Sequence, residues 1–164
     1  MLSARLRLFI YLSNSLILIY FTNLYVIDIS IFYFNTDIVS VVIATTFTLF
    51  IVVGLTNTFN FIDGIDGLAA GQALLTIILI VIVQGINDNY HQVFYLSILI
   101  SLLITYLLFN LSAFKFEKIF LGDSGSTLLG FIISWVLIYY TQPPIGIFDP
   151  IFAIWCVSLP VFDT

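Results

Sequence analysis

Long apolar stretches separated by short polar segments are the feature that most constrains this chain. Six of them can be marked, at residues 8–28, 38–56, 68–86, 93–112, 126–141 and 150–162. Most approach the ~20 residues that a helix needs to cross the hydrocarbon core of a bilayer. None shows the two-residue alternation of a membrane β-barrel. The sequence therefore predicts an all-α membrane protein, a bundle of about six transmembrane helices in one domain over residues 1–164.

The composition agrees with a lipid environment. Hydrophobic residues make up 62% of the chain and charged residues 8%, whereas about a quarter of a soluble domain is charged. Four Lys or Arg and nine Asp or Glu cannot cover a soluble domain of 164 residues. No basic patch is present in the sequence, so the charge pattern speaks against a nucleic-acid partner.

The basic residues predict how the helices are oriented. Six crossings divide the polar segments into two sets on opposite sides of the membrane. One set contains residues 1–7, 57–67, 113–125 and the C-terminus. All four basic residues belong to it, at Arg5, Arg7, Lys115 and Lys118. Because Lys and Arg are enriched in cytoplasmic segments, this set is expected in the cytoplasm, together with the chemically unusual segments 57–67, 121–126 and 160–164.

The first unusual segment, residues 57–71, lies between the second and third apolar stretches. It places four polar side chains at three-residue intervals, at Asn57, Asn60, Asp63 and Asp66. In a helical segment this spacing keeps them on one face. Carboxylates beside an apolar core are costly unless they face water, a partner or a cation. The alternative is a purely structural role, in which the segment is a loop with two Asp-Gly turns.

The second unusual segment, residues 120–126, directly precedes the fifth apolar stretch. A glycine-rich turn that leads into a helix offers unpaired N–H groups and a positive dipole end, which suit a phosphate. Asp123 is a suitable ligand for Mg²⁺, which prefers carboxylate and phosphate oxygens. Alternatively, Asp123 or Ser124 only caps the helix. Together the two segments describe a shallow site for a nucleotide diphosphate and a divalent cation.

These segments resemble the signatures of the polyprenyl-phosphate N-acetylhexosamine-1-phosphate transferases. Residues 57–71 resemble Asn-x-x-Asn-x-x-Asp-Gly-x-Asp-Gly-Leu, and residues 121–130 resemble Gly-Asp-x-Gly-Ser followed by Leu-Gly. Residues 2–8 and 159–164 are similar to stretches beside the family's Asp-Asp pair and its His-containing loop. Because this family has about ten or eleven spans, the resemblance implies a fragment of a larger fold. The Asp-Asp pair and the His loop are then expected outside residues 1–164, which leaves the isolated fragment inactive.

The resemblance also implies a reaction. N-acetylhexosamine-1-phosphate, with GlcNAc-1-phosphate favoured, is transferred from a UDP-sugar to a polyprenyl phosphate such as undecaprenyl phosphate, and UMP is released. This reaction is the first membrane step of cell-envelope glycan synthesis, for example of the O-antigen of lipopolysaccharide. The implied location is the bacterial inner membrane with a cytoplasmic active face, and a homodimer is left open.

Residue roles follow from the same resemblance. Catalytic roles are expected for Asp63, Asp66 and Asp123. Mg²⁺, or Mn²⁺ in its place, is expected at Asp123 with Asn60 as a second oxygen ligand. Nucleotide or substrate contacts are expected at Asn57, Asn60, Asp63, Asp66, Gly67, Ser124, Gly125 and Ser126. For the last three, the expected contact is a backbone N–H bond to phosphate, inferred from the chemistry of helix ends alone.

Three other interpretations of the sequence stay open. A transporter or channel could use the Asp residues as an ion path near the membrane centre. A phosphotransferase of the CDP-alcohol class also uses repeated Asp-Gly chemistry, but it places Ala-Arg soon after Asp-Gly, and no Arg follows Asp63 or Asp66. The third is a membrane scaffold without catalytic activity.

Overall fold

The computed structural model describes residues 4–31, 33–35, 37–86, 90–112 and 117–162, and this part of the chain is α-helical. These residues form no β-strand, and one isolated bridge joins Asp28 to Tyr33. The helices are α1 (Ala4–Thr22), α2 (Ile38–Ile62), α3 (Leu68–Ile86), α4 (Tyr90–Asn110), α5 (Gly122–Thr141), α6 (Pro150–Cys156) and α7 (Ser158–Phe162). The predicted all-α class is confirmed.

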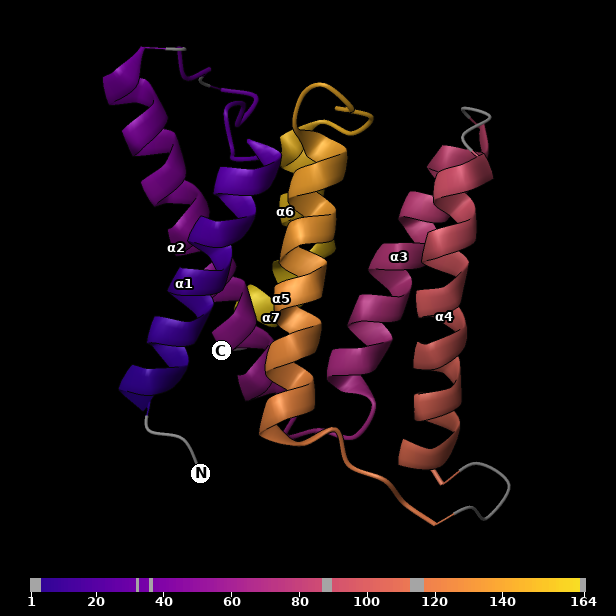
Figure 1. The fold of residues 1–164 in the computed structure, drawn as a ribbon. Coiled ribbons are helices and arrows are strands. Elements are labelled where there is room, and N and C mark those ends of the chain that lie inside the picture. Colours follow the sequence, from indigo (N-terminus) through magenta and orange to yellow (C-terminus); the bar gives the residue numbers. More distant parts are fainter. Residues whose placement is uncertain (1–3, 32, 36, 87–89, 113–116, 163–164) are drawn as a thin grey trace.

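Helices α2 and α5 pack along each other at the centre of the bundle (Figure 1). Helix α1 lies against α2, and α3 pairs with α4 and also touches α5. The core lies where α2, α3 and α5 meet, because Phe59, Ile77 and Ile133 are fully buried there. Large apolar side chains such as Leu75 and Leu102 stay exposed, as expected for surfaces that face lipid.

Four of the described helices are long and apolar enough to cross a membrane, namely α2, α3, α4 from Gln92 onward, and α5. The span predicted at 68–86 coincides with α3. Helix α2 continues to Ile62, beyond the predicted end at 56, and α5 begins at Gly122 instead of 126. Both polar segments therefore lie partly on helices, which brings Asn57, Asn60 and Asp123 onto regular backbone.

The first predicted span, 8–28, is too long at its C-terminal end. Helix α1 stops at Thr22 because Asn23 adopts a left-handed conformation with φ 52°, a common way to end a helix. The chain then runs irregularly along the bundle end. There the N–H of Val26 donates to Oγ1 of Thr48 (2.8 Å), and the Gln142 side chain bonds the backbone that follows Val26.

The last predicted span, 150–162, is not one helix, and this corrects the expectation of a sixth transmembrane helix there. It is divided into α6 and α7, and α7 lies against α2 instead of at the bundle end (Figure 1). Pro160 explains the break, because proline has no N–H to bond the carbonyl four residues earlier. That carbonyl, of Cys156, instead accepts from Nε2 of Gln72 and lies 3.4 Å from Oγ1 of Thr76.

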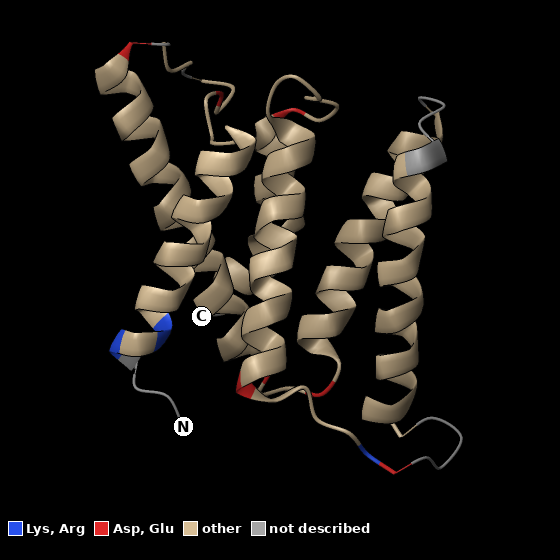
Figure 2. Ribbon diagram, viewed as in Figure 1, with Lys and Arg blue, Asp and Glu red and all other residues tan. Residues whose placement is uncertain are grey.

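The charged residues gather at the two ends of the bundle (Figure 2). One end carries Arg7, Asp63, Asp66, Lys118 and Asp123, and we call it the site end. The opposite end carries the acidic residues Asp28, Asp37 and Asp149. This separation matches the parity of the predicted crossings for α1 to α5. Lys115 and Asp163 lie outside the described residues, and α7 does not extend to the site end as residues 160–164 were expected to do.

Candidate active site

The first polar segment begins on the last turns of α2. Asn57 and Asn60 lie within the helix, Asp63 is its C-cap, and Asp66 lies in the following turn. Nδ2 of Asn57 donates to its own helix, at the carbonyl oxygen of Val53 (2.8 Å). The spacing therefore does not give four equivalent side chains, since Asn57 is bonded inside α2 and the carboxylates lie beyond the helix end.

Gly67 closes this turn and starts α3. Its φ of +75° lies in the left-handed region, which favours glycine. A Cβ atom there would also lie 3.0 Å from Cδ2 of Leu111, which directly follows α4, and 3.4 Å from Cδ2 of Leu107 in α4. The backbone of the turn is thus seated directly on α4. Because Asp66 directly precedes Gly67, this contact also fixes the position of the Asp66 backbone at the site end.

The second polar segment forms the first turns of α5. In a helix that begins at Gly122, the amides up to Ser124 have no intrahelical partner, whereas those of Gly125 and Ser126 bond back within the helix. The amides without an intrahelical partner are therefore those of Gly122, Asp123 and Ser124, and of the three residues expected to bind phosphate only Ser124 is among them. The Asp123 side chain is 52% exposed, so its carboxylate is accessible to a ligand.

Ser126 joins the two segments. Its hydroxyl donates a 2.8 Å hydrogen bond to Oδ1 of Asn60, and the Ser126 side chain is fully buried between α5 and α2. One helical turn away, Gly130 lets the two helices come close, since a Cβ atom there would lie 2.8 Å from Cβ of Phe59 and 2.9 Å from Cα of Thr56. Close packing and the polar contact together hold the two polar segments at one place.

Asp63 lies near the other two carboxylates of the site end. Partial burial raises the pKa of the Asp63 carboxyl above its usual range, and the negative charges of Asp123 and Asp66 raise that pKa further. No hydrogen bond or ion pair of Asp63 is found among the described residues. A carboxylate that lies near other negative charges and has no basic partner is typical of a ligand-binding site, where a bound cation or donor group offsets the repulsion.

Two basic residues counterbalance the other carboxylates. Nη1 of Arg7, on α1, lies 3.4 Å from Oδ2 of Asp123. Nζ of Lys118, in the connection between α4 and α5, forms an ion pair with Oδ2 of Asp66. From the sequence, the basic residues predict only the orientation of the helices, and neither pairing was predicted. No local pattern could reveal them, because each pair joins segments that are distant in the chain.

The oxygen atoms at this end fit a hard divalent cation. Asp123 offers an exposed carboxylate, and the hydrogen bond from Ser126 orients the amide oxygen of Asn60 while leaving that oxygen a second lone pair. Within the described ranges no three His, Cys, Asp or Glu side chains form a metal site by themselves. Mg²⁺ does not require such a cage, since it is usually bound by one or two carboxylates, water and substrate phosphates.

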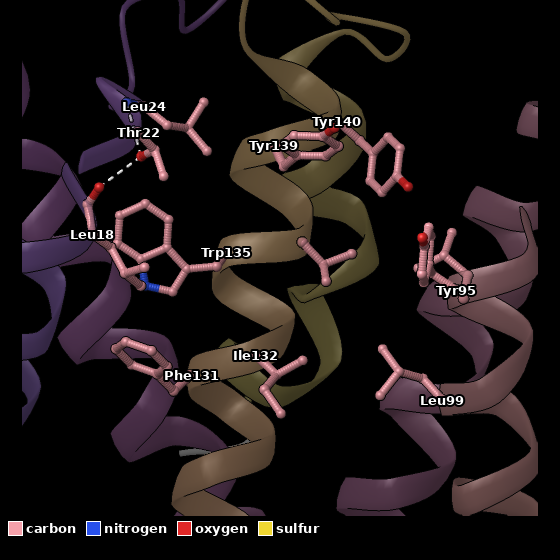
Figure 3. A pocket seen from close by; sticks show the side chains of 12 residues that line it. Leu18, Thr22, Leu24, Tyr95, Leu99, Phe131, Ile132, Trp135, Tyr139 and Tyr140 are labelled. Carbon is pink, nitrogen blue, oxygen red and sulfur yellow. Dashed lines mark hydrogen bonds between the residues drawn. The ribbon is translucent and has the colours of Figure 1, made fainter. Parts of the chain in front are cut away.

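Two cavities elsewhere in the bundle have a mostly apolar lining. Figure 3 shows one of about 490 Å³ between α1, α4 and α5, where Trp135 and Phe131 point toward α1 while Ile132 and Tyr140 point toward α4. Its lining includes none of the site-end carboxylates. A second cavity, of about 510 Å³, follows α2 between α5, α6 and α7 and includes Thr58, next to Asn57. Neither is built to hold a charged nucleotide.

The position of the carboxylates also bears on the ion-path interpretation. Asp63, Asp66 and Asp123 lie at helix ends, and the described parts of the membrane-spanning helices carry no Asp, Glu, Lys or Arg between these ends. An ion path through the membrane centre would place ionisable groups there. The arrangement favours a site at the membrane surface.

Comparison with known proteins identifies relatives of this chain. The chain is 28% identical over 163 residues to the undecaprenyl-phosphate alpha-N-acetylglucosaminyl 1-phosphate transferase of Escherichia coli O157:H7, which covers 99% of this chain and 44% of the relative. The protein of the same name from Yersinia pestis is 34% identical over 117 residues, or 71% of this chain and 32% of the relative. A probable undecaprenyl-phosphate N-acetylglucosaminyl 1-phosphate transferase of Bacillus subtilis is 34% identical over 118 residues, with the same coverage.

The chain therefore spans less than half the length of these curated relatives. No solved structure matches it. The model of the family described as glycosyl transferase family 4 matches residues 1–141, which include both polar segments and the start of α1 with Arg7. This chain belongs to glycosyl transferase family 4.

Proposed function

We propose that the protein containing this chain transfers GlcNAc-1-phosphate, or a related N-acetylhexosamine-1-phosphate, from a UDP-sugar to a polyprenyl phosphate and releases UMP. The observation that carries the proposal is the hydrogen bond from Ser126 to Asn60, which brings both polar segments together beside three carboxylates. The names of the relatives supply the carrier lipid and the sugar. The reaction would be the first membrane step of a cell-envelope glycan.

In this proposal a polyprenyl phosphate oxygen attacks the β-phosphorus of the UDP-sugar, and UMP is the leaving group. Such a transfer depends mostly on positioning and on neutralising charge. A Mg²⁺ or Mn²⁺ ion held by Asp123 and Asn60 would neutralise the diphosphate oxygens. The free amides of Gly122, Asp123 and Ser124 would bind a phosphate at the start of α5.

Asp63 and Asp66 would complete the polar wall around the nucleotide. Asp63 is the carboxylate with no hydrogen-bond or ion-pair partner among the described residues and with a raised pKa, so it is the one available to accept a donor from the substrate. Gly67 would hold this turn against α4, because a Cβ atom there would meet Leu111 and Leu107. Asn57 would support this wall through its bond to α2.

The apolar cavity along α2 supports a lipid as the second substrate. It runs from Ile29 near the opposite end to Thr58 and Phe162, and nearly all of its lining is apolar. A polyprenyl chain could lie there with its phosphate directed to the site end, because Thr58 neighbours Asn57 on the last turns of α2. Burial of apolar chain surface would supply the binding free energy, at about 25 cal/mol per Å².

The test is a transfer assay with the full-length protein in detergent or vesicles, UDP-GlcNAc, undecaprenyl phosphate and Mg²⁺. We expect a lipid-linked sugar diphosphate and an equal amount of UMP, both lost in Asp123→Asn. Asp37→Asn is the control, since Asp37 is exposed at the opposite end. Full-length protein that forms no product with any UDP-N-acetylhexosamine would refute the proposal, and ion flux without transfer would support the transporter instead.

The proposed cytoplasmic face of the bacterial inner membrane has its own test. Ile65 is exposed in the turn before Gly67, and Ile31 is exposed near the opposite end. In a Cys156→Ala background, a membrane-impermeant maleimide added to intact cells should label Ile31→Cys and leave Ile65→Cys unlabelled until the cells are opened. Labelling of Ile65→Cys in intact cells would contradict the proposed orientation and place the site end outside the cytoplasm.

A further inference from the structure

Lys118 lies at the rim of the site, between an acidic and an aromatic side chain. Its Nζ forms an ion pair with Oδ2 of Asp66 and lies 5.0 Å from the ring centroid of Phe120. The Lys118 side chain is 38% exposed and that of Asp66 is 45% exposed. The pair is therefore open to water and to any ligand that enters from the membrane surface.

The backbone that carries Lys118 is held in place by α4. Nδ2 of Asn110, the last residue of α4, donates a 2.9 Å hydrogen bond to the carbonyl oxygen of Ile119, and Asn110 is only 3% exposed. The same end of α4 supports the turn at Gly67 through Leu111. The positions of Lys118 and Asp66 are thus set by a common support, and their contact follows from the fold.

The charges at the site end favour a substrate role for Lys118. The carboxylates of Asp63, Asp66 and Asp123 outnumber the two paired cations. A UDP-sugar adds a negative charge on each phosphorus, and a lipid phosphate adds more. Exposed Lys–Asp pairs contribute little net stability, whereas a charge-assisted bond to a phosphate is among the strong hydrogen bonds. The Lys118 ammonium can therefore leave Asp66 and bind a phosphate with little loss of stability.

We propose that Lys118 binds a phosphate oxygen of the nucleotide sugar, and that Asp66 holds the ammonium at the rim until the anion arrives. This role rests on the proposed function and adds a substrate-binding residue to it. A lysine suits the task because its ammonium is a point charge with three donors on a flexible stem. No comparable cation from the described residues is placed beside Asp63.

The experiment compares Lys118→Met with wild type in the full-length protein. Binding of UDP in the presence of Mg²⁺ is measured by calorimetry, and the KM for UDP-GlcNAc is measured separately. We expect Lys118→Met to weaken UDP binding and to raise the KM by about tenfold to 100-fold, the loss typical of one charge-assisted bond. Lys118→Arg should stay within a few-fold of wild type. Glu117→Gln, which changes an exposed neighbouring charge, should leave UDP binding unchanged.

A double variant separates contact with the substrate from support of Asp66. If Lys118 touches the phosphate, Lys118→Met weakens UDP binding by a similar factor in wild type and in an Asp66→Asn background. If it acts only by holding Asp66, the substitution has no further effect once Asp66 is Asn, and the proposal is overturned. Thermal unfolding of each variant shows that the comparison is made between folded proteins.

The outcomes distinguish this proposal from the function on which it rests. Wild-type protein that binds UDP and transfers the sugar phosphate, with Lys118→Met binding UDP equally well, overturns only the role of Lys118. Wild-type protein that neither binds UDP nor forms product overturns the proposed function and this role together. A tenfold or larger loss of UDP affinity in both backgrounds supports the role.

Discussion

The hydroxyl of Ser126 donates a 2.8 Å hydrogen bond to the amide oxygen of Asn60, and this bond joins α5 to α2 at the site end. Ser126→Ala should lower the free energy of unfolding by about 1 kcal/mol, the usual worth of one buried hydrogen bond. It should also raise the Mg²⁺ concentration for half-maximal transfer by roughly threefold to tenfold, because Asn60 loses its orientation.

Ser97→Ala is the matched control for that variant. The Ser97 hydroxyl bonds to its own helix, at the carbonyl oxygen of Phe94, on the exposed side of α4. SDS-induced unfolding in mixed micelles and a Mg²⁺ titration of activity measure the two effects. An unchanged Mg²⁺ requirement in Ser126→Ala would remove Asn60 from the set of proposed cation ligands.

Gly130 of α5 packs directly against α2, with no room for a side chain. Gly130→Ala should lower the free energy of unfolding by roughly 1–3 kcal/mol, as overpacking of a filled interior does, because its Cβ would meet Phe59 and Thr56 at 2.8 and 2.9 Å. Transfer should fall too, since Ser126 and Asn60 lie one turn away. Gly85→Ala, with open space around its Cβ, should be close to neutral, and equal effects in the two variants would contradict this packing.

Asp63 should reduce stability at neutral pH. Its pKa is raised in the folded protein, chiefly by burial and then by Asp123 and Asp66, so folding favours the protonated carboxyl. The stability this provides is fully present below the unfolded pKa and is lost as the pH rises through the folded pKa. Asp63→Asn should therefore raise the unfolding temperature at neutral pH, and the gain should shrink toward zero in acid.

Transfer should decline strongly in the same variant, so that stability and activity change in opposite directions. Thermal unfolding of wild type and Asp63→Asn between acidic and neutral pH measures the difference. Asp37→Asn, at the opposite end from Asp66 and Asp123, is the control. The Asp37 carboxylate accepts hydrogen bonds from Ser40 at the start of α2, so this change should not raise stability. A stability gain that grew as the pH fell would contradict the charge repulsion assigned to Asp63.

The sequence predicted the helices best where apolar runs end in unambiguous loop residues. Helix α3 coincides with the predicted span at 68–86, because the turn at Gly67 marks its start. Hydropathy failed where polar residues continue a helix, since the amide of Asn57 bonds inside α2 and lets the helix pass through an otherwise polar stretch. Hydropathy also gave no sign of the break near Pro160. The neighbouring residues are apolar, but the missing N–H of proline interrupts the helix.

The candidate site was predictable in its residue types and less so in its contacts. Spacing and parity placed Asp63, Asp66 and Asp123 at one end, where the structure also has them. The pairings of Arg7 with Asp123 and of Lys118 with Asp66 depend on how α1 and the α4–α5 connection pack. Such contacts are set by tertiary structure, and no periodicity in one segment encodes them.

Gln142 fastens the irregular segment after α1 to the opposite end. Its Oε1 accepts from the N–H groups of Ile27 (2.8 Å) and Asp28 (2.9 Å), and its Nε2 donates to the carbonyl oxygen of Asp28 (2.9 Å). Gln142→Leu should lower the free energy of unfolding by roughly 1–3 kcal/mol, because partly buried backbone groups of Ile27 and Asp28 lose their partners. The KM for the UDP-sugar should stay unchanged, since the site lies at the other end. Ser30→Ala, an exposed position in the same segment, should cost less, and a large rise in KM for Gln142→Leu would contradict this separation of roles.

The break between α6 and α7 should depend on Gln72 as well as on Pro160. Nε2 of Gln72 donates to the carbonyl oxygen of Cys156. In a continuous helix the N–H of residue 160 would bond this oxygen, but Pro160 has no N–H. Gln72→Leu alone should cost about 1–2 kcal/mol of unfolding free energy. Combined with Pro160→Ala, which supplies the missing N–H, it should cost about 1 kcal/mol less. A double-mutant cycle of SDS unfolding measures this coupling, and strictly additive effects would mean that the Gln72 contact does not compensate for the proline.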